Sequence, residues 1–325
     1  MPEPELEEVE PARWDELVRR LGVSDVYYSR GFVEASAPLA DGGATFLHAE
    51  GDGGAVIFPC VVRHDPIDVV TPYGYGGPLG VGEDPPDFAA LYQRWCEEKT
   101  ALSTFAVFHP LLANEEQPFR TTRLADTVAW PLTEPDLLAT MHSHHRRVVR
   151  KASGRLEVAI EREPQSLDGF RAVYEQTMQR RDAADFYLFP DDYWEALRAN
   201  VPLVRVDIRH GDALVASVLG MGEPPYLHYH LGGNTDEGRT LGASHLALFS
   251  LATWGQEHGY TTLHLGGGVG GREDGLREFK RRFAPDGLVE ATIGKAVHDA
   301  AGYLRRAGAS AIDWDGFFPA YRADR

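Results

Sequence analysis

The fold is decided by residues 241–268, LGASHLALFSLATWGQEHGYTTLHLGGG, which are followed after a short spacer by LREFKRRF at 276–283. Residues 242–258 have helical periodicity, and Gly259 suits the position that ends a helix. A strand at 260–265 then runs into a glycine-rich exit, and a second helix extends to about Phe283. Glycines at a strand exit let a backbone or a ligand approach closely. This order predicts an α/β segment with a close approach where the strand ends.

The rest of the chain follows one plan twice: helices, a mostly antiparallel meander, a helix and a further strand. A helix over 133–153 is predicted to join the halves. The pattern then restarts with a strand at 156–161, so we expect two closely packed α/β domains. The predicted boundaries are a first domain over 1–135 and a second over 136–292. The segment 293–325 has no partner strands of its own and is expected to return to the first domain.

Composition indicates a globular chain of two domains. The 325 residues are 43% hydrophobic, which is enough to form a real core. The longest apolar runs are far shorter than a bilayer span, so no membrane-spanning segment is expected. Met1-Pro2 precedes glutamates rather than a basic and then apolar leader, and Cys60 and Cys96 have no metal-site spacing. These features favour a reduced, cytoplasmic protein.

The charge is strongly and unevenly negative. A net charge of -17 argues against a wide nucleic-acid-binding surface and against DNA as a partner. Two basic stretches nevertheless occur, HSHHRRVVRK at 142–151 and Lys-Arg-Arg at 280–282. Such stretches are either solvated helix faces or local anion sites.

The sequence lacks the motifs of several common binding sites and catalytic mechanisms. Gly266-x-Gly268-x-x-Gly271 matches a dinucleotide-binding motif, but no βαβ pattern surrounds it, so we interpret it as a strand exit. Neither a Walker loop nor a G-x-S-x-G elbow occurs. The thirteen histidines, including those at 142, 144, 145, 228 and 230, have no acidic partner at ligand spacing. We therefore expect neither a metal ion nor a cofactor.

Acyl transfer without a covalent enzyme intermediate remains. It needs an activated acyl donor, a positioned amine and a cation or hydrogen-bond donor for the developing oxyanion. Lys280 follows the glycine-rich exit directly, while Phe279 and Phe283 are spaced to anchor one face of the same helix. Lys280 is thus a candidate catalytic residue, and the alternative is an ordinary surface lysine.

The two quoted stretches resemble the C-terminal signature of the FemABX aminoacyltransferases, which are related to the GNAT acetyltransferases. The strand at 226–230, HRRVVRKA at 145–152 and DVVTPYGYGGPL at 68–79 extend the resemblance over most of the chain. It implies two tandem GNAT-like domains, each a mixed, mostly antiparallel sheet flanked by helices. It also implies that Lys280 of the Phe279-Lys280 pair stabilises the transferring acyl group.

The resemblance assigns further site residues. Tyr73, Tyr75, Arg147 and Tyr229 are expected to bind the acceptor, and Gly266, Gly267 and Gly268 to line the cleft beside Phe279. Arg239 begins RTLGAS at 239–244, a partial match to the pyrophosphate loop of GNAT enzymes. The helical arm of some family members has no counterpart, because no heptad region of that length occurs.

Three functions follow from these residues. In the first, the acceptor end of an aminoacyl-tRNA donates an amino acid to an amine of a peptidyl metabolite or cell-wall precursor. In the second, acyl-CoA donates to a small-molecule amine, which requires a complete pyrophosphate loop. In the third, the fold is a catalytically inactive binding module, which an occluded Lys280 would favour.

Overall fold

The computed structural model describes residues 4–115, 118–180 and 188–323. The chain divides into two compact units. The first contains residues 1–23, 27–124 and 290–325, and the second contains residues 24–26 and 125–289. Within the described ranges, no helix combines the length and the apolar character needed to cross a bilayer.

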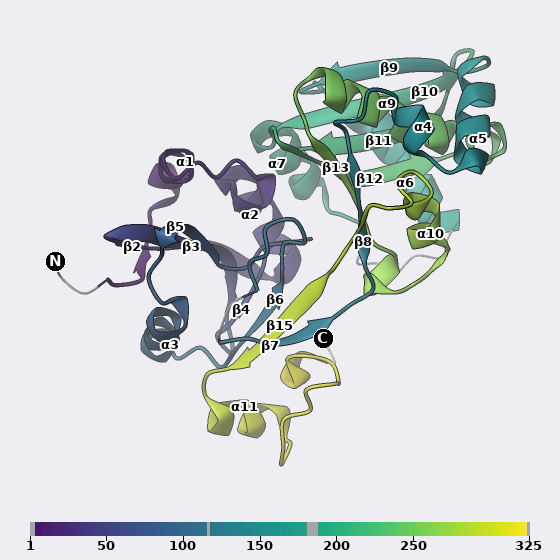
Figure 1. The fold of residues 1–325 in the computed structure, drawn as a ribbon. Helices are drawn as coiled ribbons and strands as arrows, with labels where there is room; N and C mark the ends of the chain where they lie inside the picture. The colour runs from purple at the N-terminus through teal and green to yellow at the C-terminus, as the bar shows by residue number, and fades with distance from the viewer. Residues whose placement is uncertain (1–3, 116–117, 181–187, 324–325) are drawn as a thin grey trace. The chain divides into compact units, whose positions relative to one another are not determined.

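The first unit is one mixed sheet with helices against it (Figure 1). Its sheet runs in the order β1-β2-β3-β4-β6-β15-β7, with β5 also paired to β3. All of its strand pairs are antiparallel except β4 with β6. The strands are β1 (Glu7–Glu8), β2 (Gly42–Gly51), β3 (Gly53–Arg63), β4 (Asp68–Val70), β5 (Leu79–Asp84), β6 (Ser103–Val107), β7 (Arg120–Arg123) and β15 (Thr292–Val297). The α-helices are α1 (Pro11–Arg20), α2 (Arg30–Ser36), α3 (Phe88–Lys99) and α11 (Ala300–Ala307).

The second unit is a seven-stranded sheet in the order β14-β8-β13-β12-β11-β10-β9, in which only β12 and β13 are parallel. The strands are β8 (Thr127–Pro131), β9 (Glu157–Arg162), β10 (Leu203–His210), β11 (Ala213–Met221), β12 (Tyr226–Asn234), β13 (Thr262–Gly266) and β14 (Leu288–Val289). The α-helices are α4 (Leu137–Thr140), α5 (Ser143–Ser153), α6 (Asp168–Arg180), α7 (Asp191–Asn200), α8 (Asp236–Leu241), α9 (Ala243–Glu257) and α10 (Gly275–Arg281). These two mixed sheets with flanking helices confirm the predicted fold class.

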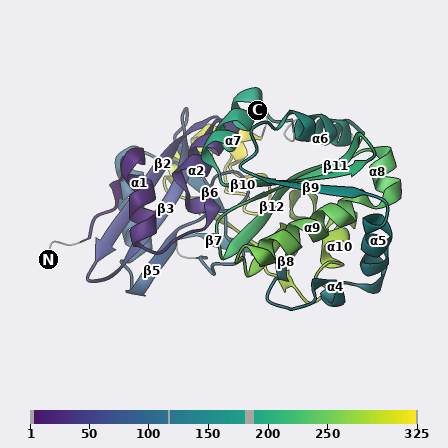
Figure 2. The same cartoon turned by 90° about the horizontal axis from the view of Figure 1, so that it is seen from above.

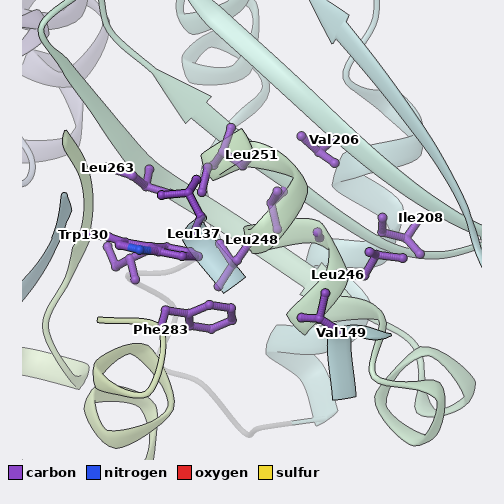
Figure 3. Packing of buried hydrophobic residues seen from close by; sticks show 14 of the residues in the cluster. Trp130, Leu137, Val149, Val206, Ile208, Leu246, Leu248, Leu251, Leu263 and Phe283 are labelled. Atoms are coloured by element: carbon purple, nitrogen blue, oxygen red, sulfur yellow. The ribbon is translucent and has the colours of Figure 1, made fainter. Parts of the chain in front are cut away.

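The core of the second unit lies between its sheet and helices α5 and α9. Val206 and Ile208 of β10 pack with Leu248 and Leu251 of α9, and Phe283 closes one end (Figure 3). Figure 2 shows α9 lying along the strands of this sheet. The sequence of α9 is apolar on most sides because the helix packs on both the sheet and α5.

The predicted boundary at residue 135 differs from the structure. β8 was assigned to the first domain, but it pairs with β13 and β14 of the second sheet, and the chain changes unit after Leu124. At the other boundary β15, predicted to return, pairs with β6 and β7 of the first sheet (Figure 1). In each sheet, the strand beside the second member of the parallel pair therefore comes from the other half of the chain: β15 lies beside β6, and β8 lies beside β13.

The joining helix predicted over 133–153 is also corrected. It is two helices, α4 and α5, separated at Met141 and His142. Each has its own N-terminal cap: the side chain of Asp136 accepts from Ala139 N, and that of His142 accepts from His144 N. Side-chain caps satisfy backbone N–H groups that a continuous helix would have satisfied internally, so they start a new helix.

Candidate functional site

The site is built where β13 ends and α10 begins. Gly266 has φ +74, and a Cβ on Gly268 would meet the Arg272 carbonyl and lie 2.5 Å from Asp274 Oδ1. Asp274 then caps α10, because its Oδ1 accepts from Arg277 N at 2.8 Å and its Oδ2 accepts from Val269 N at 2.9 Å. Glycine is therefore required by the close turn that brings α10 back beside the strand.

This glycine motif is not part of a dinucleotide-binding unit. The strand after α10 is β14, which pairs antiparallel with β8 rather than parallel with β13. A dinucleotide fold needs a parallel strand after the helix. The interpretation as a strand exit agrees with this topology.

Lys280 points inward from α10 despite its basic neighbours. Its residue is only 7% exposed, Phe283 is fully buried, and Phe279 packs against the same core. The Lys280 ammonium donates to the Gly267 carbonyl oxygen at 2.7 Å and lies 5.4 Å from the ring centroid of Tyr229. The glycine exit, the lysine and the tyrosine strand thus meet at one point.

Burial tunes the charge of this lysine. Desolvation lowers the pKa of Lys280 to about 8, and the nearby Asp274 carboxylate opposes that shift. Its partners, a carbonyl and an aromatic face, favour a cation without neutralising it. The group is therefore mostly an ammonium at neutral pH, with a pKa close to the working range of an enzyme.

The other basic residues of α10 have structural partners. Arg281 and Arg282 both bind Glu278, with Nε to carboxylate distances of 2.8 and 2.9 Å. These bonds lower the pKa of Glu278 to about 2. Arg277 is 12% exposed and donates from Nε to the Asp126 carbonyl oxygen at 2.9 Å. The stretch at 280–282 is thus one buried lysine beside a surface ion-pair cluster.

The register of β12 changes beside the lysine. Gly220 pairs with Tyr229 and Leu219 pairs with Leu231, so His230 is the extra residue of a bulge. Bulges interrupt a ladder and redirect side chains, and they are frequent next to active sites. Here the bulge follows the residue whose ring faces Lys280.

The remaining predicted residues lie elsewhere. Arg147 is exposed on α5, and Arg239 is on α8, where its guanidinium lies 3.5 Å from Asp236. RTLGAS does not form one loop, because Arg239 ends up in α8 and Gly242 separates α8 from α9. Tyr73 and Tyr75 are half-buried in the loop after β4 of the first unit. Within the second unit, the structure brings Lys280, Tyr229 and the glycines together, but leaves both arginines at the surface.

Sequence reasoning missed a buried polar chain in the second unit. His228 Nε2 lies 2.8 Å from Asp25 Oδ2, and its Nδ1 lies 3.4 Å from Nδ1 of His264. His264 Nε2 is in turn 3.0 Å from the Thr127 hydroxyl. His228 and His264 are register partners in the parallel pair β12–β13. The register of two strands separated by a helix is not encoded in either strand alone, so the sequence does not predict this pair.

A known protein family matches most of the second unit. The family model described as an acetyltransferase (GNAT) domain matches residues 140–281, from the end of α4 to the end of α10. These residues are similar to a GNAT-type acetyltransferase domain. A search of curated proteins found no significant match.

Solved structures of low identity share the fold over nearly the whole chain. FemX is 14% identical with a TM-score of 0.64, covering 93% of this chain and 99% of FemX. The C-terminal domain of a candidate lysylphosphatidylglycerol synthetase from Agrobacterium fabrum is 16% identical with a TM-score of 0.60, covering 90% and 92%. A tandem GNAT protein from the clavulanic acid biosynthesis pathway is 9% identical with a TM-score of 0.53, covering 91% and 99%. At such identities the likeness shows a shared fold alone.

Proposed function

We propose that this protein is an aminoacyltransferase that moves an amino acid from aminoacyl-tRNA to the amine of a peptidyl metabolite or cell-wall precursor. The observation that carries the proposal is the buried Lys280 ammonium on the Gly267 carbonyl and the Tyr229 ring. The similarity of the whole chain to FemX in fold supports the choice of donor. Only the acceptor end of the tRNA is expected to bind, because the protein is strongly acidic.

The chemistry needs one cation at the acyl carbonyl. The acceptor amine attacks the ester carbon, the C–N bond forms, and the ammonium of Lys280 stabilises the tetrahedral oxyanion. An ammonium has three donors, and the Gly267 carbonyl occupies one of them. The C–O bond to the tRNA ribose then breaks. The ribose oxygen leaves with the proton that the amine gives up, directly or through water.

A second candidate is an N-acyltransferase that uses acyl-CoA. The match of residues 140–281 to the acetyltransferase (GNAT) domain and the net charge of -17 favour it. The same lysine would then stabilise the oxyanion formed from the thioester. The third candidate, an inactive binding module, is favoured by the 7% exposure of Lys280.

Product analysis by mass spectrometry distinguishes the three. The protein is incubated with candidate amines and a panel of charged tRNAs or acyl-CoAs, and each donor is also offered alone. We expect an acceptor that gains one amino-acid residue with charged tRNA, and no gain after the tRNA has been deacylated. A gain from acyl-CoA alone would establish the second candidate, and no product from any donor would favour the third.

A further inference from the structure

Three histidines from two helices converge in the second unit. His144 and His145 are in the first turn of α5, and His245 is in the first turn of α9. One ring nitrogen of each lies within 4.8 Å of the corresponding nitrogens of the other two. α5 and α9 pack against each other, so residues a hundred positions apart share one cluster.

The distances suit a small metal ion. The Nδ1 atoms of His144 and His145 are 3.4 Å apart. Two nitrogens bound tetrahedrally to Zn²⁺ at its usual bond length would be separated by about 3.3 Å. The rings of His145 and His245 meet edge to face, with centroids 4.4 Å apart. A ring nitrogen of His245 lies within 4.8 Å of a nitrogen of each of the other two rings, so the three histidines are close enough to contact one ion.

A backbone carbonyl fixes the tautomer of the central ligand. His145 Nε2 lies 3.0 Å from the Phe279 carbonyl oxygen, which can only accept, so Nε2 carries the hydrogen. In the neutral ring the lone pair is therefore on Nδ1, the atom that faces His144. Metal-binding histidines commonly donate their second ring N–H to a carbonyl in this way.

The surroundings leave one open side. Phe283 contacts the His145 ring at a centroid distance of 4.6 Å, and Phe279 contacts the His245 ring at 4.9 Å. His144 is exposed, so an ion and a water ligand can enter from its side. The site combines an apolar wall, a fixed central ligand and an entry path.

Burial keeps two of the three rings, those of His145 and His245, neutral at pH 7. Burial lowers the pKa of His145 to about 4 and that of His245 to about 3. The two helix N-termini and Arg146 and Arg147 disfavour a cation that is held by charge alone. Neutral imidazoles instead coordinate through lone pairs, which select Zn²⁺, Cu²⁺, Ni²⁺ or Co²⁺ over Mg²⁺ and Ca²⁺.

We propose that His144, His145 and His245 bind one Zn²⁺ ion, with water in the fourth position. This replaces the expectation of no metal site, which rested on the absence of an acidic partner at ligand spacing from the histidines in the sequence. His245 supplies that ligand from α9. The ion would join α5 to α9, and through the Phe279 carbonyl it would brace the helix that carries Lys280.

The alternative is a metal-free cluster in which the Nδ1–H of His144 donates to Nδ1 of His145. Cobalt titration of the full-length, chelator-treated protein separates the two. We expect one equivalent of Co²⁺ to produce the visible absorption of a four-coordinate site, and one equivalent of Zn²⁺ to remove it. Absence of this spectrum in the wild-type protein would overturn the proposal.

Variants locate the ion. His144→Ala changes an exposed side chain and should fold, and His245→Ala removes the ligand from α9. Each should weaken Co²⁺ binding at least tenfold and abolish the rise in melting temperature on adding Zn²⁺. The matched control is His258→Ala at the exposed end of α9, which should bind as the wild type does. Equal binding by all three variants would place the metal elsewhere and refute the site.

Discussion

The two units differ in the connection that follows the second strand of their parallel pair. In each, a parallel strand follows a helix: β6 follows α3, and β13 follows α9. After β6, the buried amide of Asn114 donates to the Tyr28 hydroxyl and to two backbone carbonyls, at 2.8 to 3.0 Å. After β13, the corresponding connection contains α10, and its buried donor is the Lys280 ammonium. An amide with several partners stabilises a loop, whereas a cation bound to one carbonyl can act on a substrate.

The two sheets share one seven-strand path, to which the first adds β5, so the difference between the two connections is informative. The strand beside β6 is β15, and the strand beside β13 is β8, so each half of the chain lends a strand to the other. The two sheets are therefore similar, whereas the connection after β6 and the connection after β13 differ. The comparison predicts that changes at Lys280 affect turnover and that changes at Asn114 affect stability.

The largest expected effect is that of Lys280→Met. Loss of one oxyanion donor lowers kcat by about 10²–10³, and ground-state binding of the acceptor changes little. Arg281→Met is the control, because Arg281 binds Glu278 at the surface, and its effect should be much smaller. Steady-state kinetics of the acyl-transfer reaction provides both values. Equal small losses in the two variants, or unfolding of Lys280→Met, would show that the lysine is structural.

The next effect should appear in the first unit. Asn114→Ala removes the donor to Tyr28, Gly76 and Pro78 and the acceptor for His109 N. Buried groups left without a partner cost about 1–3 kcal/mol each, so we expect the free energy of unfolding to fall by about 3 kcal/mol. Urea denaturation followed by circular dichroism measures this. Asn200→Ala, at an exposed helix end, is the matched control, and a similar loss there would refute the distinction.

The arrangement around Lys280 follows in part from residues that are close along the chain. The Lys280 ammonium contacts the Gly267 carbonyl oxygen and faces the Tyr229 ring. The glycine exit and α10 are consecutive, and the Phe279–Phe283 spacing fixes which side of the helix is buried. The catalytic role of Lys280 stays a prediction.

Most of the contacts that could not be predicted join residues far apart in the sequence. Arg239 is an exception: it lies on α8 beside Asp236 because its own segment is helical, and its contact with substrate stays a prediction. The position of β8 depends on the exchange of strands between the halves, which local periodicity does not encode. His245 joins His144 only through the packing of α9 on α5.

A smaller effect should appear in the pH dependence. The pKa of Lys280 is lowered to about 8, so a reaction that needs its ammonium should lose activity above that pH. We expect kcat/KM to fall by up to tenfold per pH unit above about 8. Lys280→Arg keeps its charge at all these pH values and should lack this decline even if its turnover is lower. A wild-type profile that stays flat to pH 10 would contradict the role of the cation.

Deprotonation of Lys280 does not destabilise the fold, so unfolding caused by this group would not explain a loss of activity above about pH 8. The folded-state pKa of Lys280 lies below the ordinary lysine value of 10.5, so the unfolded chain binds more protons between about pH 8 and 10.5. The contribution of Lys280 to the free energy of unfolding therefore increases with pH over that window. Circular dichroism across the same range is the control.

The smallest expected effect is that of a chelator on catalysis. Lys280 supplies the cation of the proposed reaction, and the hydrogen bond of His145 in this region is to the backbone carbonyl of Phe279 rather than to Lys280. Treatment with EDTA should therefore leave turnover within about twofold, since no step uses the ion, while the melting temperature falls because bound Zn²⁺ stabilises only the folded state. Assays before and after treatment, with the melting curve recorded on the same sample, separate the two effects. Activity that disappears with EDTA and returns with one added metal would mean that the second unit uses a metal in catalysis. Lys280 would then no longer be the feature that distinguishes the second unit from the first.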